Sequence, residues 1–219
     1  MNTPILLTNF KTYESATGDR AVALAKVHER VAHDTQKTVV VAVQATDIFR
    51  VSQAVDIPVF AQHCDAVGFG SHTGWLLPEA VKQAGASGTI LNHSEHRFSS
   101  FDDLGNAIAR AKSVGLMTCV CAEHPEEGAR IAAHFSPDFI AVEPPELIGG
   151  DISVSTARPE LISESVAQIS VPVLVGAGVK TGDDVRIALE RGAKGVLLAS
   201  GITKSDNPEA ALRDLCRGM

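Results

Sequence analysis

The sequence predicts an α/β fold: an eight-stranded parallel (β/α)8 barrel, built as a single domain from residues 1–219. Eight apolar runs recur along the chain, amphipathic segments separate them, and 219 residues with 45% hydrophobic content suffice for one sizeable core. Strict alternation of strand and helix predicts a parallel sheet. Right-handed crossovers can close such a sheet into a barrel.

The eight apolar runs are the expected strands. Several are apolar at nearly every position, which is typical of strands buried on both faces. They are ILLTNF from Ile5, TVVVAV from Thr38, VFAQ from Val59, TILN from Thr89, MTCVCA from Met117, FIAVE from Phe139, VLVGAG from Val173 and GVLLAS from Gly195.

The connecting segments are predicted to be helices because their apolar residues recur every three and four positions. The clearest are residues 17–33, 101–114, 156–169 and 181–192. In the last segment, Thr181 with Asp184 three residues later predicts the helix start, and Gly192 predicts its end. The chain is shorter than the ~250 residues typical of such barrels, so some helices must be short.

An open doubly wound sheet is the alternative fold. The barrel is favoured because the strand count is eight and because no GxGxxG motif follows the first strand.

Composition excludes several classes of protein. The net charge of -7 comes from 26 acidic and 19 basic residues spread along the chain, which argues against nucleic acid or an anionic membrane as partner. The sequence has no apolar run of the ~20 residues of a membrane span, and MNTPILLTNFK lacks the features of a secretory signal, so a cytoplasmic protein is expected. The four cysteines form no CxxC pair, so we expect reduced core thiols and no metal site.

The chemistry of such barrels lies at the carboxyl ends of the strands. Five ends carry distinctive residues: Asn9 and Lys11 at the first, Asn92-His93-Ser94-Glu95 at the fourth, Glu143 at the sixth, Gly176-Ala177-Gly178 at the seventh and Ala199-Ser200-Gly201 at the eighth. The period of two in a strand sends Asn9 and Lys11 to the same side. Each residue alone is explained by structure, but together they bring a base, an imidazole and an ammonium to one mouth.

The last two of these ends are small-residue turns. Their glycines could serve only to permit a strand-to-helix turn. Turns after the seventh and eighth strands also match the usual phosphate site of these barrels, where backbone N–H groups at a helix start hold an anion. We favour the phosphate site.

A family resemblance runs from end to end of the chain. Asn9-Phe10-Lys11, residues 70–97, the AVEPPELIGG segment and the GAG and LLAS turns resemble the triosephosphate isomerases, most of all the short archaeal type. The resemblance implies interconversion of dihydroxyacetone phosphate and D-glyceraldehyde 3-phosphate through an enediolate, in glycolysis and gluconeogenesis. It implies no cofactor.

The resemblance also implies catalytic roles. Glu143 is the expected base, His93 the neutral electrophile, and Lys11 the positive charge beside the substrate. Asn9 is expected to donate a hydrogen bond to the same oxygen region, and Glu95 to pair with Lys11. A helix is expected to start directly after His93.

The phosphate ligands implied by the resemblance are backbone N–H groups of Ile148, Gly149, Gly178, Ala199 and Ser200, together with Asn9 and Lys11 in the substrate site. Ile148 and Gly149 belong to a lid whose hinge would be stiffened by two prolines that follow Glu143.

The resemblance further implies a homotetramer. The loop GFGSHTGW resembles a family loop that inserts into a neighbouring subunit, which would place Trp75 near an interface. The alternative is that Trp75 packs within its own subunit.

The sequence leaves two other functions open. A sugar-phosphate aldolase would need a Schiff-base lysine on a central strand, whereas Lys180 and Lys194 lie outside the strands. A catalytically silent barrel that senses a sugar phosphate would keep the two small-residue turns but would not need Glu143.

Overall fold

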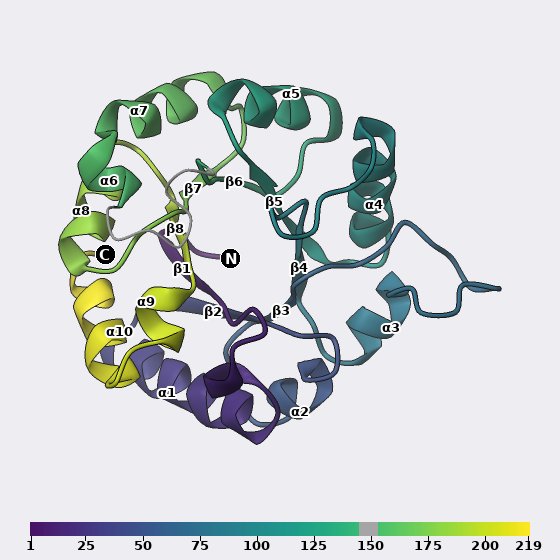
Figure 1. Ribbon diagram of the computed structural model, residues 1–219, viewed down its shortest axis with the longest axis horizontal. Coiled ribbons are helices and arrows are strands. Elements are labelled where there is room, and N and C mark those ends of the chain that lie inside the picture. Colours follow the sequence, from purple (N-terminus) through teal and green to yellow (C-terminus); the bar gives the residue numbers. More distant parts are fainter. Residues whose placement is uncertain (145–152) are drawn as a thin grey trace.

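The computed structural model describes residues 1–144 and 153–219 as a closed barrel of eight parallel strands in the order β1 to β8 (Figure 1). Every strand pairs in parallel with the strands before and after it. The predicted fold class is therefore confirmed. The strands are β1 (Ile5–Asn9), β2 (Thr38–Val43), β3 (Val59–Ala61), β4 (Gly88–Leu91), β5 (Met117–Ala122), β6 (Phe139–Val142), β7 (Val173–Val175) and β8 (Gly195–Leu198).

The helices form an outer ring around the strands (Figure 1). The helices are η1 (Glu14–Ala16), α1 (Asp19–Thr35), α2 (Ile48–Ser52), α3 (Pro78–Gln83), α4 (Phe101–Ser113), α5 (Pro125–Phe135), α6 (Val154–Ala157), α7 (Pro159–Gln168), α8 (Gly182–Glu190), α9 (Ser200–Thr203) and α10 (Pro208–Arg217). The expected shortening falls on α2 and α3, which have five and six residues. In the part of the chain described, no helix has both the length and the apolar character to cross a membrane.

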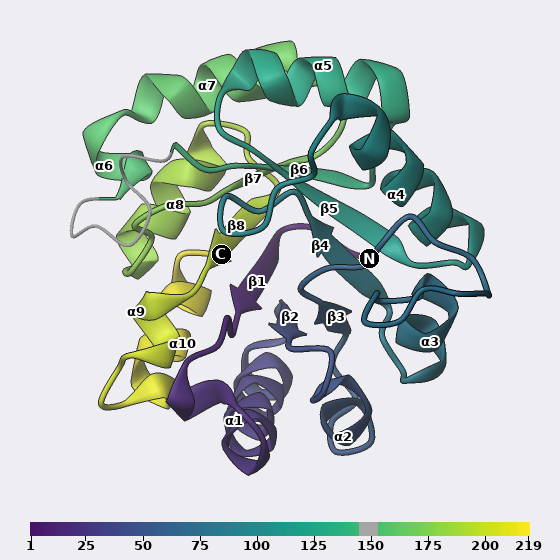
Figure 2. The ribbon, with the colours of Figure 1, turned by 45° about the vertical axis from the view of Figure 1, so that its right-hand side comes forward.

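The first and last elements of the chain close the ring. β1 pairs with β8, and α10 packs beside α1 in both views (Figures 1 and 2). Two exposed ion pairs, Arg213 with Asp34 and Arg30 with Glu209, also join these helices. The pairing of β1 with β8 and the packing of α1 against α10 stabilise the closed ring more than the ion pairs do, because solvent screens exposed ion pairs.

Alternation along the strands divides the apolar residues into two cores. One core fills the space between the strands and the helices. The other fills the barrel interior, with Ile5 and Leu7 of β1, Phe139 and Ala141 of β6, Leu174 of β7 and Leu197 of β8 among its members. Because side chains alternate with a period of two, the next inward positions at the carboxyl ends are Asn9, Glu143, Gly176 and Ala199. The predicted functional residues Asn9 and Glu143 thus lie at the carboxyl-terminal end of the barrel interior.

The local predictions are mostly confirmed. Thr181 and Asp184 form a capping box at the start of α8, and Gly192 follows that helix with φ +97°. The helix predicted over residues 156–169 is wrong as a single element, because Pro159 begins a new helix, α7, after the short α6. Proline clashes with a helical conformation of the preceding residue, here Arg158.

Candidate active site

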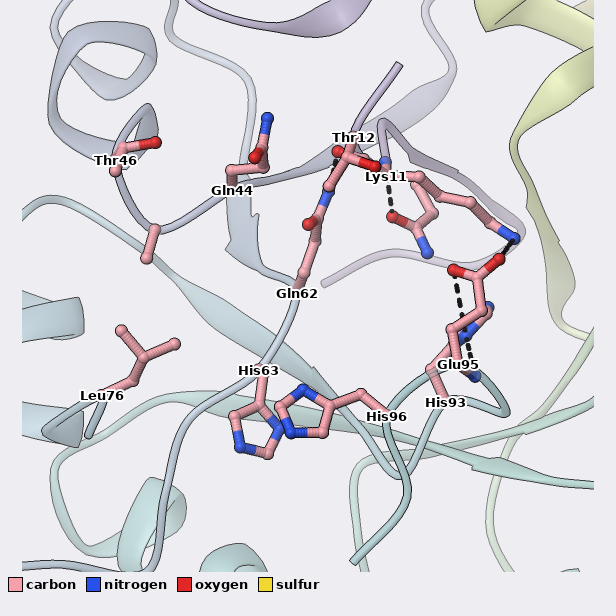
Figure 3. A pocket seen from close by; sticks show the side chains of 12 residues that line it. Lys11, Thr12, Gln44, Thr46, Gln62, His63, Leu76, His93, Glu95 and His96 are labelled. Atoms are coloured by element: carbon pink, nitrogen blue, oxygen red, sulfur yellow. Dashed lines mark hydrogen bonds and ion pairs between the residues drawn. The ribbon is translucent and has the colours of Figure 1, made fainter. Parts of the chain in front are cut away.

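The described residues that the sequence predicted for catalysis and phosphate binding gather at one end of the barrel. A small cavity of about 40 Å³ is lined by Asn9, Lys11, His93, Glu143, Gly178, Ala199 and Ser200, among others. A larger cavity of about 360 Å³ shares Asn9, Lys11 and His93 and adds Glu95 (Figure 3). The two remaining predicted phosphate ligands, Ile148 and Gly149, lie outside the described residues.

Glu143 directly follows β6 and is 7% exposed. Its carboxylate oxygen Oε2 is buried and has no hydrogen-bond partner among the described residues, and it lies 3.7 Å from Nε2 of His93. A buried carboxylate oxygen without a partner is costly, and such atoms are uncommon away from functional sites. Glu143 therefore holds an acceptor atom ready for a ligand, beside the imidazole.

Gly176 provides the space that Glu143 occupies. A Cβ atom at this position would lie 2.3 Å from Cγ of Glu143 and 2.6 Å from its Oε1. From the sequence we expected this turn to belong to the phosphate site, and no relation to Glu143 was predicted. The close approach of the two residues shows that Gly176 is required for the position of the carboxylate.

A left-handed residue directs His93 into the site. Asn92 continues the inward series of β4, but its φ of +60° ends the strand, and its Nδ2 donates to the carbonyl of Cys121 at 3.2 Å. Asparagine is one of the few residues that adopt this conformation readily. The turn allows the next side chain, His93, to face the mouth although strand alternation would turn it outward.

The helix expected directly after His93 is absent. Residues 94–96 form a turn closed by the N–H of His96, which donates to the carbonyl of His93 at 2.8 Å, and α4 begins only at Phe101. The prediction was wrong because Ser100, which caps α4 through the N–H of Asp103, is the stronger helix start.

The same turn fixes the tautomer of His93. The backbone N–H of Glu95 donates to Nδ1 of His93 at 3.1 Å, so Nδ1 is an acceptor and the ring hydrogen belongs on Nε2. The Glu95 carboxylate lies farther from Nδ1, at 3.7 Å. A neutral His93 therefore presents an N–H donor toward Glu143 and the cavity.

Lys11 reaches the site by a left-handed turn beyond the strand. β1 ends at Asn9, and Lys11 has φ +47°, so its placement does not follow from strand alternation. Its N–H donates to Oδ1 of Asn9 at 3.0 Å, and its Nζ donates to Oε1 of Glu95 at 2.7 Å (Figure 3). The predicted pairing of Lys11 with Glu95 is present.

The turns after β7 and β8 present backbone to the cavity. Ala177 and Gly178 have φ of +71° and +72°, and Ser200 begins α9 immediately after Ala199. Successive N–H groups in such turns can form concave sites for anions. This side of the cavity can therefore bind an anion through main-chain groups.

Sequence inspection missed several neighbours of the site. Cys121 is one, since burial and the nearby Glu143 carboxylate hold the pKa of its thiol well above the ordinary value. Nothing in the sequence distinguishes it from the other core cysteines, all of which are buried free thiols.

Gln62 and His63 are two further neighbours. Gln62 donates to the carbonyl of Lys11 at 3.0 Å, and His63 stacks on His96 with ring centroids 4.2 Å apart (Figure 3). Burial lowers the pKa of His63, and the hydrogen bond with Asp65 partly opposes this effect. Because Gln62 and His63 follow β3, the rule applied to other strand ends could have identified them.

No group of three or more His, Cys, Asp or Glu side chains is arranged to hold a metal ion within residues 1–144 and 153–219. The site instead combines a buried carboxylate, a neutral imidazole donor, an ammonium and main-chain N–H groups. These groups can move a proton and stabilise an anion.

Comparison with known proteins identifies the family. A family model described as triosephosphate isomerase matches residues 4–218. The chain belongs to the triosephosphate isomerase family. Relatives of that name include one from Methanobacterium bryantii, 49% identical over 218 residues that span 97% of this chain and 96% of the relative. Another, from Methanothermobacter thermautotrophicus, is 50% identical over 98% of this chain and 95% of the relative.

A solved structure supports the fold independently. The crystal structure of triosephosphate isomerase from Bartonella henselae superimposes with a TM-score of 0.76 at 20% sequence identity, covering 99% of this chain and 98% of that one. Membership of the triosephosphate isomerase family, which the sequence motifs predicted, is thus confirmed by the family model and the relatives.

Proposed function

We infer that the chain, acting as one barrel domain of residues 1–219, interconverts dihydroxyacetone phosphate and D-glyceraldehyde 3-phosphate in glycolysis and gluconeogenesis. The family match and the names of the relatives support this reaction. The reaction moves one hydrogen from a carbon to its neighbour and a second hydrogen between the oxygens on these two carbons, so no atom is gained or lost overall.

Glu143 acts as the base. Its Oε2, which has no hydrogen-bond partner among the described residues, takes a proton from the carbon next to the carbonyl group and returns a proton to the neighbouring carbon. His93 donates a hydrogen bond from Nε2 to the oxygen on which negative charge develops, as its tautomer allows. This division of labour between a carboxylate base and a neutral imidazole is the known scheme of the triosephosphate isomerase family, and the placement of its residues is specific to this chain.

Lys11 and Asn9 stabilise the developing charge. The Lys11 ammonium lies beside the cavity and is oriented by Glu95, so it can attract the substrate dianion and stabilise the enediolate. The Asn9 side chain accepts from the Lys11 N–H through Oδ1, which leaves its amide N–H groups available to the substrate oxygen.

The phosphate group binds mainly through main-chain N–H groups. Gly178, Ala199 and Ser200 border the same cavity as Glu143, and we assign them this role together with Ile148 and Gly149. The aldolase alternative lacks support, because Lys11 is the one lysine among the described residues that line these two cavities, and it follows β1 instead of lying within a strand.

One observation carries the proposal: Oε2 of Glu143 and Nε2 of His93 lie 3.7 Å apart in a cavity also lined by Gly178 and Ser200. The test is a coupled assay in which dihydroxyacetone phosphate formed from added glyceraldehyde 3-phosphate is reduced. We expect turnover that saturates with substrate. Phosphate binding without turnover would instead support the silent sensor.

We also propose a homotetramer, as the sequence resemblance implies. Phe69 and Trp75 are 77% and 57% exposed on the loop between β3 and α3, which projects from the ring in Figure 1. Exposed apolar side chains grouped on one loop are typical of a contact surface. Sedimentation at micromolar concentration tests the assembly, and a single monomeric species would contradict it.

A further inference from the structure

Asp184 receives more hydrogen bonds than a helix cap needs. It is the third residue of α8 and 7% exposed. Its Oδ2 accepts from the Thr181 hydroxyl at 2.9 Å and from the N–H groups of Thr181 and Lys180 at 3.0 and 3.1 Å. This oxygen therefore holds the end of the loop that leads from β7 to α8.

The other oxygen of Asp184 holds a different segment. Oδ1 accepts a short hydrogen bond from the Ser153 hydroxyl and another from Oγ1 of Thr156 at 3.2 Å. Ser153 is 4% exposed, and Thr156 belongs to α6. One carboxylate thus joins α6 and the residue before it to the loop after β7, with one oxygen for each segment.

The cap of α4 shows what an ordinary carboxylate does at this position. Asp103 is also the third residue of its helix, but it is exposed. Among the described residues, its Oδ2 accepts only from the neighbouring hydroxyls of Ser99 and Ser100, at 2.6 and 2.8 Å. Burial tends to raise the pKa of Asp184, but the hydrogen bonds from Ser153, Lys180 and Thr181 outweigh burial and lower it. Asp184 is therefore held as a carboxylate in its buried position.

The loop that Asp184 holds contains a strained backbone. Ala177 has φ +71° and Gly178 follows with φ +72°, both bordering the cavity. A non-glycine residue in this region is disfavoured and persists only where the surrounding structure fixes it. Lys180 and Thr181, three and four residues after Ala177, are the points at which Asp184 fixes this loop.

We propose that Asp184 is a positioning residue for substrate binding: it holds the loop of Ala177 and Gly178 in its anion-binding shape by tying that loop to Ser153 and Thr156. The inference deepens the function proposed above and rests on it, because it takes the phosphate to bind at Gly178. A loop already in its binding conformation loses less entropy on binding, so the bridge increases phosphate affinity without touching phosphate.

The test compares Asp184→Asn with Asp103→Asn, a matched carboxylate-to-amide change at the third position of another helix. The measurements are kcat, KM for glyceraldehyde 3-phosphate, binding of inorganic phosphate by calorimetry, and Tm. For Asp184→Asn we expect KM and the phosphate Kd to rise together, on the order of tenfold, while kcat changes less. Asp103→Asn should lower Tm and leave both KM and the phosphate Kd unchanged.

Ser153→Ala provides a second, milder test. It removes one donor to Oδ1, together with the acceptor of the Thr156 N–H, and leaves the capping box of α8 intact. We expect the phosphate Kd to rise about threefold, and to rise little further when Ser153→Ala is added to Asp184→Asn, since both changes break one bridge. If Asp184→Asn fails to fold, Ser153→Ala alone decides the inference.

Unchanged phosphate affinity in Ser153→Ala, or in a folded Asp184→Asn protein, would overturn the inference and leave Asp184 a helix cap. Absence of turnover in the unmodified protein would instead contradict the proposed reaction. In that case calorimetry with inorganic phosphate still tests Asp184, and an unmodified protein that did not bind phosphate would refute the positioning role as well.

Discussion

The two sides of the barrel mouth present different kinds of atoms to the cavity. After β1, β4 and β6 the cavity is lined by the ionisable side chains of Lys11, His93 and Glu143. After β7 and β8 it is lined by small residues such as Gly178 and Ser200, whose main-chain groups we propose as the phosphate ligands. Side chains can be removed one at a time by substitution. Backbone groups can be altered only through the conformation of their loop, so residues that hold the loop matter there more than residues that line it.

The largest effect is expected from the base on the side-chain side. Glu143→Gln keeps the shape of the side chain but removes the carboxylate that accepts the proton, so kcat should fall by at least ~10²- to 10⁴-fold with little change in KM. The coupled assay measures both parameters, and thermal unfolding serves as the control for folding. Near-normal turnover would show that the base lies elsewhere.

Gly176 connects the two sides of the mouth. Its backbone directly follows β7, and because it has no Cβ it leaves room for the Glu143 side chain. The methyl added in Gly176→Ala would meet Cγ of Glu143 at 2.3 Å and displace the carboxylate, so we expect kcat to fall by about 10²-fold. The Tm of the variant serves as the control for folding. A kcat equal to that of the unmodified protein would contradict the placement of Glu143.

Substitutions of Lys11 and His93 should change different kinetic parameters, because Lys11 contributes to substrate binding as well as to chemistry whereas His93 contributes mainly to chemistry. Lys11→Met removes the charge that meets the dianion, so KM should rise about tenfold and kcat should fall, whereas His93→Gln should lower mainly kcat. Lys11→Met also leaves Glu95 without its 2.7 Å ion pair. If Lys11→Met left KM unchanged, the ammonium would not contribute to substrate binding.

His28 lies on α1, away from the cavity and packed against β1, so its substitution should affect stability alone. Its Nδ1–H donates to the Leu24 carbonyl at 2.8 Å and its Nε2 accepts from the Thr8 hydroxyl at 3.0 Å, so the buried ring is neutral and joins α1 to β1. Burial lowers the pKa of His28 from 6.5 to about 4. The unfolded chain therefore binds the extra proton first, and this contribution to stability is lost as the pH falls from about 6.5 toward 4.

Urea unfolding at fixed protein concentration should show a loss of about 2 kcal/mol from this histidine between pH 7 and pH 5. His28→Gln should reduce that pH dependence and leave KM near its normal value at pH 7. An unchanged pH dependence in His28→Gln would show that other groups dominate acid unfolding.

The fold could be predicted because its determinants are local and repeated. Apolar runs identified the strands, and the rule that chemistry lies at their carboxyl ends then placed Asn9 and Glu143 at one mouth. Lys11 and His93 line the same cavity as Glu143, but the strand-end argument that grouped them was incomplete, because left-handed residues that no periodicity reveals turn the chain there. The hydrogen bond that Oδ1 of Asp184 accepts from Ser153 could not be predicted. The two residues are 31 positions apart in the sequence, and their contact depends on packing that a local pattern does not show.

The pairing of β1 with β8 has a consequence for biosynthesis. During translation, β1 emerges from the ribosome first and must wait for almost the whole chain before its second neighbour, Gly195–Leu198, becomes available. Until then the nascent sheet carries an unpaired edge on β1, and such edges can recruit strands from other chains. A polypeptide released before Gly195 would keep that edge permanently, so premature termination near the carboxyl terminus should yield aggregates instead of a slightly shortened enzyme.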